Sequence, residues 1–213
     1  MKKPIVVLIN GISLAGKDTF CMYCSCFASI VITSTVDQVK QIAQNEFGWD
    51  GVKDEKGRKL LTMLRESWNT YNNGSTDYVI SEIYNGYGEN IDIIFVMIRE
   101  FNEMMYFKNH PLMKDFYVST MWVERAGNFP GETEQRFIDM IPEDYRFDYY
   151  INNSYDRAEL LGLAFRFVYN SEVVENCIDL IEANMDADSL AYQFDRDRNY
   201  SASMPNTNPT EVP

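Results

Sequence analysis

The residues best suited to chemistry lie near the start of the chain, in the order Gly11, four intervening residues, Gly16, Lys17, Asp18 and Thr19. Glycines let backbone N–H groups curl around an anion without a Cβ in the way, and a helix that follows adds free N–H groups and a positive dipole end. A lysine at this spacing reaches the β- and γ-phosphates of a nucleotide, and a threonine hydroxyl can ligate Mg²⁺. The spacing predicts a phosphate-binding loop, in which Asp18 stands where such loops usually carry Ser or Thr.

The segments on either side of this motif favour the same interpretation. Residues 5–9 are uniformly apolar, as in a short strand that is buried on both faces. After the loop, Phe20, Cys24 and Phe27 recur at the spacing of one helical face. A strand that turns through glycines into a helix is the context that the motif requires, which argues against the alternative of a chance match.

Composition and charge restrict the partners. The chain has 213 residues, 46% of them hydrophobic, which is enough for one domain with a large core. Its net charge of −13 argues against nonspecific binding to nucleic acid or to an anionic membrane, and no apolar stretch approaches the roughly 20 residues of a membrane span. Three of the four cysteines cluster at Cys21, Cys24 and Cys26, and we expect buried apolar thiols in a reducing cytosol rather than a metal site.

Four further apolar runs predict strands at residues 28–33, 92–98, 116–123 and 147–151. Helical patterns separate them, at about residues 36–43, 58–71, 77–84, 100–109, 133–141, 157–169 and 173–183. Short apolar strands that alternate with helices indicate a parallel sheet. We therefore expect an α/β protein with the three-layer P-loop NTPase fold, in which a five-stranded parallel sheet carries helices on both faces.

In such sheets, ligands bind beyond the carboxyl ends of the strands. Arg99 and Arg125 follow the third and fourth predicted strands there, and Asn153 follows the fifth. Arginine suits a phosphorylated acceptor because its planar fork binds phosphate oxygens bidentately. Arg58 and Arg65 are two helical turns apart and project from nearly the same face.

The segment after the second strand is the predicted start of an acceptor site. Ser34 can cap the next helix, Asp37 lies in its first turn, and Lys40 is placed one turn later to reach an acceptor phosphate. For Asp37 the alternative is support of its own helix start, and for Lys40 it is a solvated side chain. For Arg65 and Arg136 the alternative is a surface salt bridge.

The run of residues 11–19, GISLAGKDT, resembles the phosphate loop of the phage-type deoxynucleoside monophosphate kinases, which share its Gly-Lys-Asp-Thr ending. Residues 34–40, STVDQVK, resemble the capped helix that opens the acceptor region of that group, and residues 57–61, GRKLL, are similar to its Arg-x-x-Leu segment. The resemblance covers about residues 4–153, and only the first motif is specific.

The resemblance implies transfer of a phosphoryl group from ATP to a (deoxy)nucleoside monophosphate in the cytoplasm of a bacterial or phage-infected cell. We expect a single kinase-like domain over residues 1–200, with acceptor-binding helices over about 34–88. The glycines and prolines of residues 126–144 favour a lid that closes over the site, with an ordinary surface connection as the alternative. The low apolar content of residues 201–213 predicts a disordered tail.

Residue patterns and resemblance together define the candidate site. Catalysis is assigned to Lys17, Asp18, Arg99 and Arg125. ATP binding is assigned to Gly11, Ala15, Gly16, Lys17, Asp18, Thr19 and Asn153. Acceptor binding is assigned to Ser34, Asp37, Lys40, Arg58, Arg65, Arg99 and Arg136, and Mg²⁺ binding to Thr19 and Asp18.

Two other hypotheses stay open. One is a P-loop kinase of another small phosphorylated or hydroxylated metabolite. The other is a nucleotide-binding switch or ATPase, which the pattern disfavours because the third strand ends in Arg99-Glu100 rather than in a metal-binding aspartate. The sequence leaves the oligomeric state open, with a homodimer as one alternative, and nucleotides are the expected partners.

Overall fold

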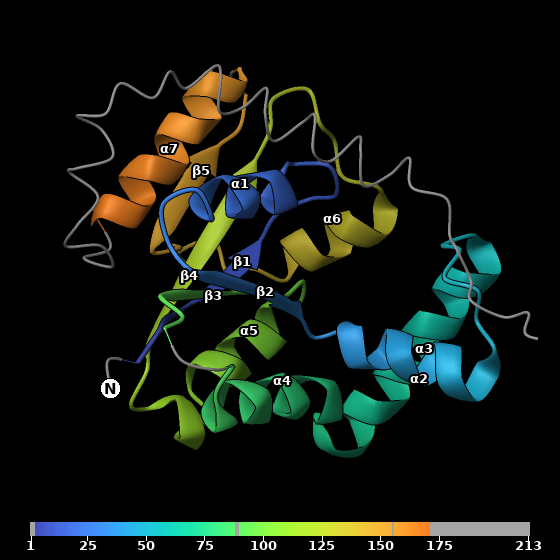
Figure 1. The fold of residues 1–213 in the computed structure, drawn as a ribbon. Coiled ribbons are helices and arrows are strands. Elements are labelled where there is room, and N and C mark those ends of the chain that lie inside the picture. Colours follow the sequence, from blue (N-terminus) through green and yellow to red (C-terminus); the bar gives the residue numbers. More distant parts are fainter. Residues whose placement is uncertain (1–2, 88–89, 155, 171–213) are drawn as a thin grey trace, which may run out of the picture.

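The computed structural model describes residues 3–87, 90–154 and 156–170, and its centre is one five-stranded sheet (Figure 1). All neighbouring strands pair in parallel. In spatial order the strands are β2 (Ile30–Ser34), β3 (Ile93–Met97), β1 (Ile5–Asn10), β4 (Tyr117–Glu124) and β5 (Tyr149–Asn152). The predicted parallel sheet is confirmed, and the phosphate loop leaves its central strand.

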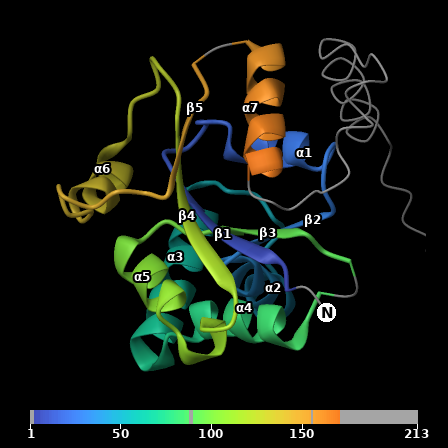
Figure 2. The ribbon, with the colours of Figure 1, turned by 90° about the vertical axis from the view of Figure 1, so that its left-hand side faces the viewer.

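Helices cover both faces of the sheet. On one face lie α1 (Lys17–Cys24) and α7 (Arg157–Asn170), and on the other lie α4 (Gly74–Asn85) and α5 (Phe101–Lys108) (Figures 1 and 2). The remaining helical elements are α2 (Asp37–Phe47), α3 (Glu55–Asn72), a 3₁₀ turn (Pro111–Met113) and α6 (Glu132–Asp139). This three-layer arrangement confirms the predicted fold class.

Burial on both faces explains why β1 is apolar throughout. Val7 and Ile9 point into the cluster formed with α1 and α7, whereas Val6 and Leu8 point into the cluster formed with α4 and α5. All four side chains are fully buried, and burying each contributes about 1.5–3 kcal/mol to folding. The strand that carries the phosphate loop is therefore among the most firmly held parts of the chain.

Helices α2, α3 and α6 extend from the end of the sheet at which the strands terminate. In Figure 1, α2 follows the end of β2 directly and packs with α3, while α6 lies beyond the ends of β1 and β4. Side chains of α6 line a small pocket together with Asn10 at the end of β1, Arg99 just after β3 and Trp122 in the last part of β4. The helices predicted to hold the acceptor and the predicted lid thus surround the carboxyl edge of the sheet.

Three helix boundaries differ from the sequence-based expectation. The helix expected to reach Phe27 ends at Cys24. The helix predicted from residue 58 begins at Glu55, because the carboxylate of Asp54 caps it by accepting a hydrogen bond from the Gly57 N–H at 2.7 Å. The helix predicted from residue 77 begins at Gly74, where a Cβ would collide with the indole of Trp68. The predicted helix at 173–183 and the predicted tail at 201–213 lie outside the described residues.

Within the part of the chain that the structure describes, no helix is both long and apolar enough to cross a membrane.

Candidate functional site

Two positions of the phosphate loop have backbone angles that favour glycine. Gly11 and Gly16 have φ values of 137° and 89°, in the range that side-chain-bearing residues rarely adopt. A Cβ at Gly11 would collide with the carbonyl of Val123, and a Cβ at Gly16 would collide with the amide of Asn153. The glycine spacing thus reflects tight packing of the loop against the ends of β4 and β5.

Lys17 begins α1 and turns its ammonium back over the start of the loop. Its Nζ donates hydrogen bonds to the carbonyls of Gly11 and Ile12, both at 2.7 Å. Asp18 is exposed and Thr19 is half-buried in the first turn of the same helix. A hydroxyl and a carboxylate are the oxygen ligands that Mg²⁺ prefers, so the donor set at this helix start fits a nucleotide–magnesium complex.

Asn10 connects the loop to the end of β3. It is 5% exposed; its Oδ1 accepts a hydrogen bond from the Gly11 N–H at 2.6 Å, and its Nδ2 donates one to the Arg99 carbonyl at 3.0 Å. The exposed guanidinium of Arg99 lies 5.8 Å from the ring centroid of Phe137 in α6, within cation–π range. Arg99 and Phe137 line the small pocket together with Gly11, so a cation from β3 and the phosphate loop share one location.

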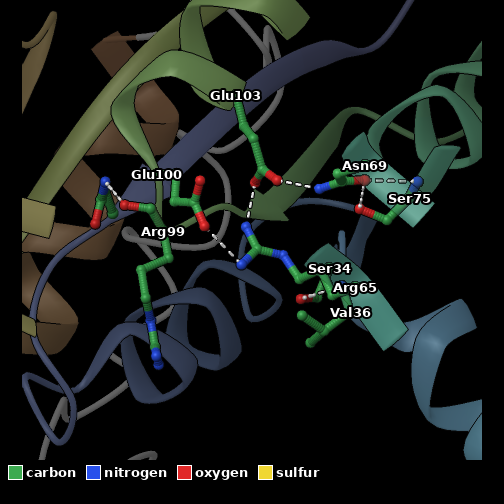
Figure 3. A network of polar contacts seen from close by, with 9 residues as sticks. Ser34, Val36, Arg65, Asn69, Ser75, Arg99, Glu100 and Glu103 are labelled. Carbon is green, nitrogen blue, oxygen red and sulfur yellow. Dashed lines mark hydrogen bonds and ion pairs between the residues drawn. The ribbon is translucent and has the colours of Figure 1, made fainter. Parts of the chain in front are cut away.

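Arg65 lies at the centre of a polar network (Figure 3). Its Nη1 donates to Glu100 Oε1 at 2.8 Å and its Nη2 to Glu103 Oε2 at 2.5 Å. The second oxygen of Glu103 accepts a hydrogen bond from Asn69, whose own Oδ1 accepts from the hydroxyl and N–H of Ser75. The network joins α3, α4 and the start of α5. Arg65 is thus in a salt bridge, but a largely buried one rather than the surface salt bridge that was its alternative.

Burial and charge act against each other in this network. The side chains of Arg65 and Glu103 are 13% and 12% exposed, against 28% for Glu100. Burial alone would lower the pKa of Arg65, but the two carboxylates outweigh it and raise that pKa above its ordinary value. Burial raises the pKa of Glu103, although Arg65 opposes this. Arg65 is thus held charged by two carboxylates.

The other predicted acceptor residues are spread around the same edge. The Oγ of Ser34 accepts a hydrogen bond from the Val36 N–H at 3.3 Å, and Lys40 pairs with Asp37 at 2.6 Å. Arg58 is exposed at the start of α3, where its Nε donates to the Lys53 carbonyl at 2.8 Å. Ser34 ends β2, whereas Asp37, Lys40 and Arg58 lie on residues 37–72, which we call the α2–α3 arm.

The remaining predicted cations lie after β4 and on α6. Arg125 is exposed directly after β4, and Arg136 is exposed on α6, where it lines a shallow depression with Pro130 and Asp139. Among the described residues no ion pair holds Arg99, Arg125 or Arg136.

Asn153 faces the backbone of the loop. Its Nδ2 donates to the Ala15 carbonyl at 2.8 Å, and the side chain is almost fully buried. Sequence patterns missed a related contact, in which Nδ2 of Asn128 donates to the Ser13 carbonyl at 2.6 Å. They also missed the contact of Phe137 with Arg99. Of the polar side chains that contact the loop, only Asn10 was recognisable from its local sequence, because it lies between a strand and the first glycine.

The cysteines behind the loop are unsuited to chemistry. Burial raises the pKa of the Cys21, Cys24 and Cys26 thiols above the ordinary value, so they stay protonated near neutral pH. No group of three metal-ligating side chains occurs among the described residues.

With its central glycine loop and five parallel strands, the chain has the P-loop NTPase fold. It is similar to TT1252 from Thermus thermophilus, with a TM-score of 0.50 and 14% identity over 80% of this chain and 98% of that one. Shikimate kinase from Bacteroides thetaiotaomicron gives a TM-score of 0.42 and 14% identity over 79% and 98% of the two chains. Thymidylate kinase from Candida albicans gives 0.41 and 11% over 80% and 93%. At these identities the likeness concerns the fold alone. No protein-family model and no curated protein matches the sequence.

Proposed function

We propose that this chain is an ATP-dependent kinase that transfers a phosphoryl group to a (deoxy)nucleoside monophosphate, giving ADP and a nucleoside diphosphate. The observation that carries the proposal is the convergence of two cations on one glycine loop. Lys17 Nζ contacts the carbonyls of Gly11 and Ile12, and Arg99 lines a pocket with the same two residues. Phosphoryl transfer depends mainly on positioning and on neutralising charge over oxygens, which is what such a pair of cations does.

The chain's residues divide this work between them. Loop N–H groups and the start of α1 hold the phosphates of ATP, and Lys17 adds a positive charge there. Arg99 and Arg125 hold the anionic acceptor or the transferred group from the ends of β3 and β4. Thr19 and Asp18 are the residues that would hold Mg²⁺, which when bound neutralises charge on the phosphates.

Helix α6 contributes by excluding water, which otherwise competes with the acceptor. Its Phe137 contacts Arg99, and Ile138 and Ile141 line the pocket beside Gly11. Phe137 and Ile138 lie on α6 and Ile141 lies just after it, so these apolar side chains face the carboxyl edge of the sheet, where the proposed lid over residues 126–144 would close.

A second candidate, a kinase of a small hydroxylated metabolite, is favoured by one observation. Two of the three cations predicted on the acceptor arm are already paired, Arg65 with Glu100 and Glu103, and Lys40 with Asp37. Pairing leaves less positive charge from these two side chains for an anionic acceptor, and so suits a less anionic one. Of the three predicted cations, only Arg58 has no carboxylate partner among the described residues.

The test is a coupled ADP-release assay with ATP and Mg²⁺, first with uncharged polyols and nucleosides as acceptors and then with each common deoxynucleoside or ribonucleoside monophosphate in turn. We expect one or a few of them to stimulate turnover, and Lys17→Ala to lower kcat/KM by about 100-fold or more, the scale of removing one preorganised electrostatic contact. Lys114→Ala is the matched control, because Lys114 is exposed just before β4 at the opposite end of the sheet. Stimulation only by uncharged polyols or nucleosides would replace the first candidate with the second, and no stimulation by any acceptor would reject both.

A further inference from the structure

Asparagine side chains hold the backbone of the phosphate loop at two points. We infer that Asn153 and Asn128 are positioning residues, which turn the loop's N–H groups toward a bound polyphosphate by fixing the carbonyls of Ala15 and Ser13. This inference deepens the proposed function and rests on it, because it assigns the loop to polyphosphate binding. It also gives Asn153 a different role from the direct nucleotide contact that its position after β5 predicted.

Asn153 is itself rigidly placed. Its backbone N–H donates to the Glu124 carbonyl at 2.8 Å, which extends the pairing of β4 with β5 by one residue. Its side chain is 8% exposed, and its Nδ2 donates to the Ala15 carbonyl at 2.8 Å. The orientation of one loop peptide is therefore determined by the end of the sheet.

The contact at the Ala15 carbonyl also fixes the direction of the N–H group in the same peptide. The C=O and N–H of a planar trans peptide point in opposite directions, and the described residues contain no cis peptide. When Asn153 holds the Ala15 carbonyl, the Gly16 N–H must point away from Asn153. By the same reasoning, Asn128 at the Ser13 carbonyl turns the Leu14 N–H away from the segment after β4.

The two contacts flank a strained residue. Leu14 has a φ of 63° and is 84% exposed, and a left-handed conformation costs a side-chain-bearing residue about 1–2 kcal/mol. Such conformations persist where the surroundings over-determine them, and they concentrate at ligand-binding sites. Here Asn128 fixes the peptide before Leu14, and Asn153 fixes the peptide that follows Ala15, which holds the loop in the strained shape.

The need for glycine at position 16 follows from the same arrangement. A Cβ on Gly16 would overlap the Nδ2 of Asn153, so the amide can approach the loop only because that residue lacks a side chain. Gly16 and Asn153 therefore act as a pair, although they lie far apart in the chain.

The test compares Asn153→Asp with Asn152→Asp, using inorganic tripolyphosphate and ATP as probes in titration calorimetry. The first substitution keeps the shape of the side chain, but a carboxylate cannot donate a hydrogen bond to the Ala15 carbonyl. The exposed neighbour Asn152 receives the same charge without that contact. We expect at least a tenfold weaker Kd for both probes in the first variant and less than a twofold change in the second. Asn128→Ala, at a less buried site, should weaken both Kd values by about threefold to tenfold and guards against misfolding of the first variant.

The outcomes separate this inference from the proposed function. If Asn153→Asp and Asn128→Ala only lower Tm and leave both Kd values unchanged, the two residues are merely structural and the inference is wrong. It is also wrong if the wild-type protein binds neither probe. If the wild-type protein binds tripolyphosphate, the variants lose that binding, and no acceptor supports turnover, the inference stands and the proposed kinase activity does not.

Discussion

Replacing Glu103 with glutamine tests how much the buried network around Arg65 contributes to folding. Glu103 accepts from Arg65 Nη2 at 2.5 Å with one oxygen and from Asn69 with the other, and its side chain is 12% exposed. Glutamine has the same shape but must turn its NH₂ group toward one of these two donors. One hydrogen bond is thereby replaced by a contact between donors, without any cavity.

The magnitude follows from the geometry. A hydrogen bond to a charged group contributes about 1.5–3 kcal/mol, and removing one partner of a fully buried ion pair costs about 3–5 kcal/mol. Glu103→Gln should fall below the second range, since Glu100 still pairs with Arg65 and the desolvation of one carboxylate is relieved. We expect the free energy of unfolding to drop by about 2 kcal/mol. Glu100→Gln, at a side chain that is 28% exposed with a single partner, should cost about 1 kcal/mol or less.

Urea denaturation followed by circular dichroism measures both values. With a slope of about 2 kcal/mol per molar urea, Glu103→Gln should lower the midpoint by about 1 M and Glu100→Gln by about half of that or less. Equal shifts in the two variants would mean that the extent of burial does not determine which carboxylate contributes more to stability. An unchanged midpoint for Glu103→Gln would refute the reasoning that Arg65 is a structural cation.

Three further outcomes are expected from other parts of the fold. The hydrogen bonds from Lys108 and Thr120 lower the pKa of Asp148 despite the opposing effect of burial. The contribution of Asp148 to stability is therefore present above the unfolded pKa of 3.8 and lost as the pH falls through the lower folded value. The urea midpoints of wild type and Asp148→Asn should differ at pH 7 and converge only as the pH falls below 3.8 and through the folded pKa. Burial raises the pKa of the Cys21 and Cys24 thiols. Mass spectrometry should therefore show that both react with a thiol reagent at about pH 8 only in urea, and rapid labelling of the native protein would contradict their burial. Leu14→Gly should raise the free energy of unfolding by up to about 1 kcal/mol, because the left-handed strain is relieved at an exposed site, and a lower midpoint in the same urea assay would show that the Leu14 side chain makes stabilising contacts.

The sequence predicted the sheet and the loop because both leave local signals. A strand buried on two faces is apolar at every position, so residues 5–9 stood out without any partner being known. The loop requires glycine at Gly11 and Gly16 for backbone angles that those positions impose. Helix starts were less predictable, since the cap at Asp54 and the packing of Gly74 against Trp68 depend on how the chain folds around them.

The long-range hydrogen bonds that hold the site together could not be predicted from local sequence. Asn153 meets Ala15 across 138 positions, and Asn128 meets Ser13 across 115. An asparagine in a loop is compatible with a turn, a cap or a long-range contact, so its residue type alone does not identify its partner. The same holds for Arg65, whose two carboxylates are 35 and 38 positions away, and the sequence left its role open between a salt bridge and an acceptor contact.

The pairing of cations bears on which part of the site recognises the acceptor. Arg99 and Arg125, at strand ends beside the loop, are not held in ion pairs by any described residue, whereas Arg65 and Lys40 on the α2–α3 arm are. A cation already bound to a carboxylate gains less from a phosphate, because the existing partner must first be displaced. In the proposed kinase, the predicted cations that are free to attract a second anion therefore include Arg99 and Arg125 at the ends of β3 and β4, together with Arg58 on the α2–α3 arm. Under the same proposal, the paired side chains Arg65 and Lys40 would contribute shape and hydrogen bonding, so we expect substitutions of these two residues to change which acceptor is preferred more than they change the rate with the best one.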